Sequence, residues 1–360
     1  MDEKELMQFL IKKDLFDTVK NNAYYFKRIF KQCFNASEND SIVLVSDLGE
    51  DERNVAAMVA GAYCMAAKSL GIEISVLLQS SSSTNVTDEK VANGLLNLQK
   101  GGIAMMALTN KLGTLGGKEK SYRTLAKSKG HRFASSTSLG GLTNDKFADF
   151  VKAIDIDYFS LQRRMQLVKE KLDAGNEVNV TTPAGTDIRL KIKHQKAISV
   201  AGEYINNGNG GNIPVGEVYM PPDKKDVEGM IVIDGSMRDH QMTRIISSPI
   251  RMTVKDGAVT DIEGGEEAKL LEQSLQRAES MSKYSWGVRR IGEFGIGMNP
   301  GARIIGSTLI DEKTLGTCHF ALGSNYWFGG TIKAIIHYDQ VLKNPTIKVD
   351  DEVLKFTEQP

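Results

Sequence analysis

The strongest constraint on the fold is a change of pattern along the chain near residues 155–175. Before this region short apolar runs alternate with helical segments, and after it short strands follow one another with one clear helix between them. Alternating strands and helices predict a parallel sheet with helical connections, whereas consecutive strands predict antiparallel sheets. We therefore expect an α/β protein with an N-terminal α/β layered domain over 1–160 and a C-terminal β-rich α+β domain over 161–360.

The first half predicts one alternating unit. Residues 1–38 favour one or two helices, and the apolar run Ile42–Val45 favours a strand. The elements expected after it are a helix over 50–70, a strand over 72–78, a helix over 91–99, a strand over 103–108 and a helix over 119–129. Gly71 marks the end of the first of these helices, because glycine ends helices readily.

The second half predicts mostly strands. After a helix over 161–175, strands are expected over 178–180, 188–192, 230–233, 252–254 and 259–262. Asp256-Gly257 lies between the last two and indicates a tight hairpin, since this dipeptide tolerates positive φ. Leu271, Leu275 and Ala278 mark the buried face of a helix over 266–282. The Asn/Gly-rich run over 206–212 is typical of a flexible loop.

Composition excludes several classes of protein. Lys+Arg and Asp+Glu both number 45, so the formal net charge is zero, and neither nucleic acid nor an anionic membrane is expected as a partner. The N-terminus lacks the apolar core of a signal peptide, and no apolar stretch is long enough to span a bilayer. Three cysteines without Cys-x-x-Cys spacing favour a reducing compartment over a disulfide framework or zinc knuckle. We expect a cytoplasmic protein.

A glycine-rich segment after the strand expected over 103–108, GTLGGK over 113–118, invites comparison with a phosphate-binding loop. A Walker A loop needs a glycine where Leu112 stands and a serine or threonine where Glu119 stands. No G-x-G-x-x-G follows the first strand either, so dinucleotide binding has no support. The segment is interpreted as a turn.

His337 and Asp339 lie in the strand-like run KAIIHYDQV. Residues two apart on a strand point to the same face, so the imidazole and the carboxylate point together. They form a possible pair of metal ligands, and the alternative is a structural His–Asp hydrogen bond in the wall of a sheet.

Three further residues carry the same donor types within the second domain. Glu217 lies in NIPVGEVYMPP, Glu293 in RRIGEFGIGMNP and His319 in GTCHFALGSNYWFGG, each within an apolar or glycine-rich run. A carboxylate in such a run is costly unless it is paired or bound to a cation. The alternatives are a salt bridge for the glutamates and a hydrogen-bonded core residue for the histidine. Three carboxylates and two imidazoles together match the needs of one or two divalent ions.

These segments resemble the aminopeptidase T / aminopeptidase S family of metallopeptidases. The matching pieces are NIPVGEVYMPP, IGEFGIGMNP, DEKTLGTCHFALGSNY and IIHYDQV, in the family's order along the whole second half, and DIDYFSLQRRMQLVKEKL matches more loosely. The resemblance implies a metal-dependent hydrolase that releases N-terminal residues from short peptides with Zn, Co or Mn. It also implies a homodimer.

Carried over by position, the resemblance implies a set of site residues. The metal ligands would be Glu217, Glu293, His319, His337 and Asp339. Glu312 would be the general base toward a metal-bound water, and Tyr326 would donate a hydrogen bond to the developing oxyanion. The alternatives are a surface or capping role for Glu312 and aromatic packing for Tyr326.

Three departures from that family keep other functions open. Gly216 stands where the family has a second glutamate, two extra residues separate Glu312 from His319, and the chain is shorter than the typical peptidase. The first alternative is a ring-cleaving dioxygenase of the dihydroxypyridine dioxygenase type, which uses a single Fe(II) held by two histidines and a carboxylate. Asp339 favours the peptidase, because the resemblance implies that those dioxygenases have a second imidazole at this position. The second alternative is a non-catalytic binding protein on the same scaffold.

Overall fold

The computed structural model describes residues 2–81, 86–115 and 121–357. The chain divides into two compact units, one formed by Met1–Phe159 with Gly202–Val215 and the other by Ser160–Ala201 with Gly216–Pro360. The sequence places Gly202–Val215 in the second domain, whereas in the structure it returns to the first unit. Each unit is described by itself below.

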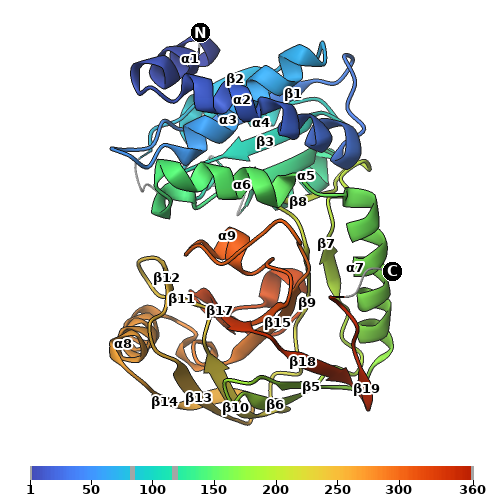
Figure 1. The fold of residues 1–360 in the computed structure, drawn as a ribbon, viewed down its shortest axis with the longest axis vertical. Coiled ribbons are helices and arrows are strands. Elements are labelled where there is room, and N and C mark those ends of the chain that lie inside the picture. Colours follow the sequence, from blue (N-terminus) through green and yellow to red (C-terminus); the bar gives the residue numbers. More distant parts are fainter. Residues whose placement is uncertain (1, 82–85, 116–120, 358–360) are drawn as a thin grey trace. The chain divides into compact units, whose positions relative to one another are not determined.

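The first unit is the α/β layer. Its helices are α1 (Asp2–Lys12), α2 (Phe16–Arg28), α3 (Val55–Ser69), α4 (Glu89–Asn97), α5 (Tyr122–Lys129) and α6 (Phe147–Ile154). Its strands are β1 (Ile42–Ser46), β2 (Ser75–Leu78), β3 (Ile103–Ala107), β4 (Arg132–Ser136) and β8 (Gly210–Asn212), and they form one sheet in the order β2-β1-β3-β4-β8. Every neighbouring pair in this sheet is parallel, as the alternating pattern predicts (Figure 1).

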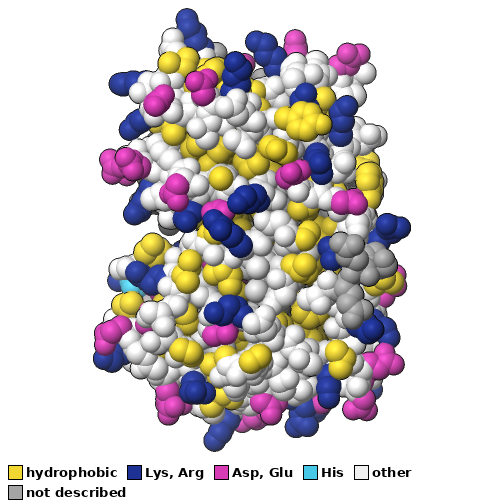
Figure 2. Space-filling model, in the orientation of Figure 1, with side chains coloured by type: hydrophobic (Ala, Val, Ile, Leu, Met, Phe, Trp, Pro, Cys, Tyr) yellow, Lys and Arg dark blue, Asp and Glu magenta, His cyan; other side chains and the backbone are white. Residues whose placement is uncertain are grey.

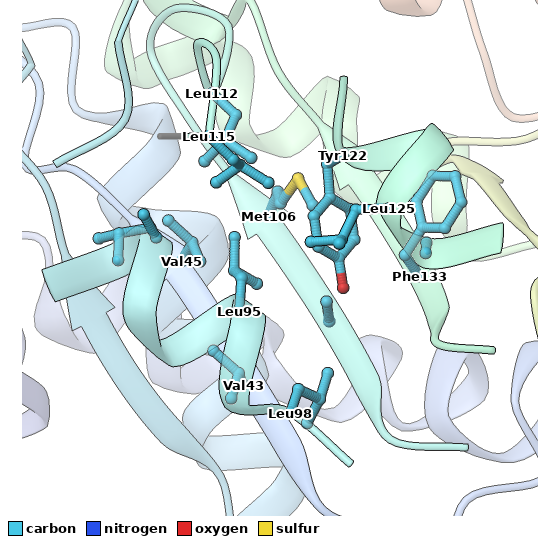
Figure 3. Close-up of a cluster of buried hydrophobic side chains, with 14 of the residues drawn as sticks. Val43, Val45, Leu95, Leu98, Met106, Leu112, Leu115, Tyr122, Leu125 and Phe133 are labelled. Atoms are coloured by element: carbon cyan, nitrogen blue, oxygen red, sulfur yellow. The ribbon is translucent and has the colours of Figure 1, made fainter. Parts of the chain in front are cut away.

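Helices cover both faces of the parallel sheet. Val43 and Val45 of β1 and Met106 of β3 point toward α4 and α5, where they pack with Leu95 and Leu125 (Figure 3). The alternate residues of β1 are also buried, and α3 contacts both β1 and β3. Burial on both faces explains why these strands are continuous apolar runs rather than alternating ones.

Several boundaries in the first unit differ from the expected ones. Helix α3 begins at Val55 instead of at residue 50, because residues 50–54 form a turn that ends at Asn54, whose side chain donates to the Leu48 carbonyl oxygen. The Asn/Gly-rich run is not simply a flexible loop, since Gly210–Asn212 pairs with β4 as strand β8. Strand β4 and helix α6 were not expected. Part of the GTLGGK segment, residues 116–118, lies outside the described residues, as do the first two residues of the helix expected over 119–129.

The second unit is β-rich, as expected. One sheet has the order β14-β13-β10-β6-β5-β18-β19, and its strands are β5 (Glu177–Thr181), β6 (Asp187–Lys191), β10 (Val227–Ile233), β13 (Ile250–Lys255), β14 (Ala258–Glu263), β18 (Thr346–Val349) and β19 (Glu352–Val353). The other has the order β12-β11-β17-β16-β15-β9-β7, and its strands are β7 (Ile198–Val200), β9 (Glu217–Met220), β11 (Ser236–Arg238), β12 (Thr243–Ile245), β15 (Ile291–Gly297), β16 (Thr317–Gly323) and β17 (His337–Lys343). The described pairings within both sheets are antiparallel.

The helices of this part of the chain are α7 (Tyr158–Ala174), α8 (Glu266–Met281) and the single turn α9 (Thr308–Asp311). Leu271, Leu275 and Ala278 of α8 are buried, as their spacing predicts. The hairpin at Asp256-Gly257 is also confirmed: both residues have positive φ, and β13 pairs with β14 across them. The structure is therefore a mixed α/β fold in which a parallel sheet is followed by two antiparallel sheets.

Two surface features bear on possible partners. Among the described residues, no helix is both long and apolar enough to cross a membrane. On the face of the molecule that Figure 2 shows, basic and acidic side chains are interspersed over both parts of the chain. A field of one sign, of the kind that gathers nucleic acid, is not seen on that face.

Candidate metal centre

Neighbouring strands of the second sheet carry the candidate side chains on one face. In the register of β15, β16 and β17, Glu293, Ala321 and Asp339 form one row of paired positions, and Gly295 is paired with His319. Residues two apart on a strand share a face, so these rows lie over the same surface. The small residues at Gly295 and Ala321 leave the space into which the larger donors extend.

The exact aim of Glu293 depends on a β-bulge. The register between β15 and β16 shifts between Ile291 and Glu293, so Gly292 is the extra residue. The buried Asn325 side-chain amide donates to the Gly292 carbonyl oxygen at 2.9 Å. Bulges redirect side chains beside functional sites, and this one turns Glu293 toward the two imidazoles.

Glu293 lies between both histidines. One carboxylate oxygen, Oε1, is 3.2 Å from His319 Nε2, and the other, Oε2, is 3.5 Å from His337 Nε2. His337 Nε2 is also 3.3 Å from Asp339 Oδ1, and His319 Nε2 is 3.7 Å from Glu217 Oε2. All five residues that the sequence proposes as ligands therefore meet around the two Nε2 atoms.

These donors form two overlapping groups that could hold a metal ion. One group is Glu217, Glu293 and His319, and the other is Glu293, His337 and Asp339, each with ligand atoms within 4.8 Å of one another. The donors are nitrogen and oxygen atoms, without thiolate. Glu293 belongs to both groups, so the two positions are not independent.

A buried lysine, which the sequence analysis missed, stands beside the first group. Lys313 is 0% exposed, and its Nζ lies 3.1 Å from Glu217 Oε1 and contacts Glu312. Burial lowers the pKa of this ammonium, but the charges of Glu217 and Glu312 raise it well above its usual value. Lys313 therefore stays charged and supplies one positive charge to this side of the site.

The charges of the described cluster do not balance without protons or a cation. Four carboxylates (Glu217, Glu293, Glu312 and Asp339) face one ammonium, and all are nearly buried. Burial alone lowers the pKa of both imidazoles, but the hydrogen bond and charge of Glu293 raise that of His319 to about 9, and Asp339 raises that of His337 to about 10. Without a metal the imidazoles hold protons that a divalent ion would displace, so metal affinity rises with pH.

The remaining carboxyl groups respond to the same surroundings. Burial raises the pKa of Glu312, and the nearby charge of Glu217 raises it further, to about 8. Burial also raises the pKa of Glu293. Burial acts the same way on Asp339, but the charge of His337 prevails and lowers its pKa to about 2. Burial thus favours the protonated forms of Glu312 and Glu293, whereas Asp339 stays ionised beside His337.

The orientation of His337 is fixed from outside the cluster. Its Nδ1 lies 2.9 Å from the Ser324 carbonyl oxygen, and since a carbonyl can only accept, Nδ1 is the donor. Nε2 is therefore left to face the carboxylates, as is usual for metal-binding histidines. The His337 side chain is 21% exposed, whereas those of the other four proposed ligands are at most 7% exposed, so the cluster meets solvent at His337.

The two residues proposed as catalytic are placed differently. Glu312 is buried and adjoins the cluster through Lys313. Tyr326 is 60% exposed, and its ring face carries the Lys333 ammonium, 4.4 Å from the centroid. The rings of its neighbours Trp327 and Phe328 pack against His337 instead, with centroids 4.7 Å and 6.2 Å from the imidazole. Trp327 has no periodic or motif signal in the sequence that would single it out.

The space for His319 provides a test of this packing. A Cβ added at Gly295 would lie 2.0 Å from His319 Nε2, so Gly295→Ala is expected to displace the imidazole and weaken Co(II) binding by about 10- to 100-fold. Titration followed by the visible absorption of bound Co(II) measures this. Gly265→Ala is the control, because its Cβ would meet nothing closer than 3.7 Å. Equal affinities of the two variants would show that His319 is not held as described.

Comparison with known proteins places these features in context. The model of the 2,5-dihydroxypyridine 5,6-dioxygenase family (NicX) matches residues 156–355, a range that includes all the residues of the cluster. A 2,5-dihydroxypyridine 5,6-dioxygenase of Pseudomonas putida is 24% identical over 202 residues, which cover 54% of this chain and 56% of the relative. The chain thus matches little more than half of the relative's length.

Two solved structures share the fold. The structure of the 2,5-dihydroxypyridine dioxygenase from Pseudomonas putida aligns with a TM-score of 0.70 at 17% identity, covering 92% of this chain and 94% of its own. AmpT from Thermus thermophilus aligns with a TM-score of 0.59 at 13% identity, covering 91% of this chain and 94% of AmpT. The resemblance to the aminopeptidases is therefore one of fold.

These matches overturn the expected activity. The family model, the curated relative and the better-scoring of the two structures are all dioxygenases, so the expectation of an aminopeptidase, or of any metallohydrolase, is wrong. The error has a chemical reason: both classes use imidazole and carboxylate donors on one scaffold, and the donor types do not distinguish them. Asp339 does not distinguish the two classes, since the range that the family model matches contains this residue. Nothing in the cluster supports Zn, Co or Mn in particular.

Proposed function

Because the chain belongs to the 2,5-dihydroxypyridine 5,6-dioxygenase family, we propose that it is a metal-dependent dioxygenase that opens a dihydroxylated nitrogen-containing aromatic ring. The observation that supports this most is the convergence of His319, His337, Glu293 and Asp339 within the range that the family model matches. Imidazole and carboxylate donors with positions left for other ligands suit the non-haem Fe(II) of oxygenases.

The donors fit one Fe(II) better than two. Lys313 Nζ lies 3.1 Å from Glu217 Oε1, so an ammonium already compensates this carboxylate. A second divalent ion beside Glu217 would stand close to that charge, and like charges repel strongly in a buried site. We infer that Glu293, His319, His337 and Asp339 are the ligands of one ion and that Glu217 is held by Lys313.

The bound iron would supply the one-electron chemistry with O₂ that side chains lack. The protein's own groups have separate tasks. Ser324 holds the His337 ring through Nδ1, and Lys313 compensates the charges of Glu217 and Glu312 on the buried side of the cluster. The burial of Glu217, Glu293 and His319 excludes water from the inner side of the cluster.

Oxygen uptake tests the proposed activity. Protein reconstituted with Fe(II) without air and then mixed with aerated 2,5-dihydroxypyridine is expected to consume one O₂ for each ring lost, with both atoms of labelled O₂ in the product. A chelator added before the substrate is expected to stop the reaction. Absence of O₂ uptake with every dihydroxylated pyridine tried, by protein shown to contain iron, would refute the proposal.

A further inference from the structure

We propose that Trp327 is the surface on which the substrate ring packs at the metal centre, an inference that rests on the proposed function. Trp327 belongs to a short 3₁₀ turn, Tyr326–Phe328, between β16 and β17. Its ring meets that of His337 with centroids 4.7 Å apart and planes at 71°. It is nevertheless 53% exposed, so much of the indole is open to a ligand beside the cluster.

The exposed part of Trp327 lies where a ligand would arrive. Of the four proposed iron ligands, His337 has the most exposed side chain, at 21%, and His319 is fully buried. A molecule that reaches the cluster from solvent therefore passes His337. The rings of Trp327 and Phe328 both contact His337, with centroids 4.7 Å and 6.2 Å away, but Phe328 is buried, so Trp327 is the one open to a ligand. Planar aromatic molecules gain from edge-to-face and offset contacts with indole.

Tyr326 is less suited to this role. The Lys333 ammonium lies 4.4 Å from the centroid of its ring and 5.6 Å from that of Tyr284, so a cation already occupies the Tyr326 face. No such cation contact with Trp327 is found among the described residues. Tyr326 and Lys333 instead form a cation–π pair in the same connection between β16 and β17.

The turn that carries Trp327 is held rigidly by one buried amide. Asn325 is 1% exposed; its Oδ1 accepts from the Ile332 backbone N–H at 2.8 Å, and its Nδ2 donates to the Gly292 carbonyl oxygen. Its backbone carbonyl also accepts from the N–H groups of Phe328 and Gly330. Asn325 thus ties the turn to the bulge that aims Glu293, which fixes the indole relative to the metal ligands. A surface fixed in advance loses little entropy on binding.

The experiment uses the fact that the chain has two tryptophans, Trp286 and Trp327. In a Trp286→Phe variant all indole fluorescence comes from Trp327. Anaerobic Fe(II)-loaded protein binds 2,5-dihydroxypyridine without turnover, and this titration is expected to quench the emission of that variant. In Trp327→Phe the remaining emission of Trp286 is expected to stay unchanged. Oxalate serves as the metal-binding control that lacks a ring, and it is expected to quench much less.

Steady-state oxygen uptake gives the second readout. Trp327→Ala is expected to raise KM about tenfold with kcat changed less than about twofold. In Trp327→Phe the KM is expected to lie close to the wild-type value, because an aromatic ring is kept. Thermal unfolding verifies that both variants fold. A wild-type KM in Trp327→Ala, together with unquenched emission in Trp286→Phe, overturns this inference and leaves the proposed dioxygenase activity intact. Absence of oxygen uptake in the wild-type protein overturns the proposed function, and this inference with it.

Discussion

Replacing His337 by alanine is expected to abolish oxygen uptake and to weaken Fe(II) binding by more than about 100-fold. His337 Nε2 lies 3.5 Å from Glu293 Oε2 and 3.3 Å from Asp339 Oδ1, so its loss removes one of the two imidazole donors from the ligand set. Outer partners of metal ligands typically contribute about 10- to 100-fold to affinity, and a ligand itself contributes more. Anaerobic titration with Fe(II) and an oxygen electrode measure the two effects.

A second histidine of the same unit serves as the control for that variant. His240 lies outside the cluster, with Nδ1 2.8 Å from Ser274 Oγ, and His240→Asn is expected to retain both Fe(II) binding and oxygen uptake. The assignment of His337 fails if its alanine variant binds Fe(II) as tightly as the His240→Asn protein does.

Replacing Lys313 by methionine is expected to lower the free energy of unfolding of the metal-free protein by about 3–5 kcal/mol. The substitution leaves the buried Glu217 and Glu312 without the ammonium that both contact. Removing one partner of a buried ion pair is costly because the remaining charge is left without compensation. Urea unfolding followed by circular dichroism measures the loss.

Lys343 provides a matched lysine for comparison. Its side chain is 48% exposed and its Nζ is 4.0 Å from Asp234 Oδ2, so Lys343→Met is expected to change stability by less than about 0.5 kcal/mol. The Lys313→Met protein is also expected to take up a second Co(II) ion, because Glu217 is then free to bind one. A loss of stability below about 1 kcal/mol, with metal uptake unchanged, would contradict the role given to Lys313.

Strand periodicity was enough to pair some of the site residues. His337 and Asp339 are two apart in an apolar run, so a shared face followed from the period alone, and the structure has them in contact. Their meeting with Glu293 could not be derived in this way. It depends on the bulge at Gly292 and on the absence of a side chain at Gly295, neither of which leaves a periodic signal.

Residues that act through burial were harder to predict. Lys313 lies in the charged segment DEKT, which has the composition of a surface turn, yet it is 0% exposed. Only the three-dimensional arrangement shows that Glu217, far away in the sequence, is its partner. The resemblance to peptidases implies a role for Tyr326 and none for Trp327. The conformation of the turn, which Asn325 holds, decides that Trp327 rather than Tyr326 contacts His337.

The fold class followed from the order of elements, but one connection did not. The run over 206–212 has the glycine and asparagine content of a loop, and it still supplies β8 to the parallel sheet. Backbone hydrogen bonds to β4 need no particular side chain, so a strand of this kind has no apolar pattern to detect. The return of Gly202–Val215 to the first unit depends on that pairing.

The most direct test of the metal centre is anomalous diffraction at the iron edge from crystals reconstituted anaerobically with Fe(II). We predict one strong peak for each chain, in contact with Glu293, His319, His337 and Asp339, and none between Glu217 and Lys313. An absent peak, or a peak away from these four side chains, would contradict the account.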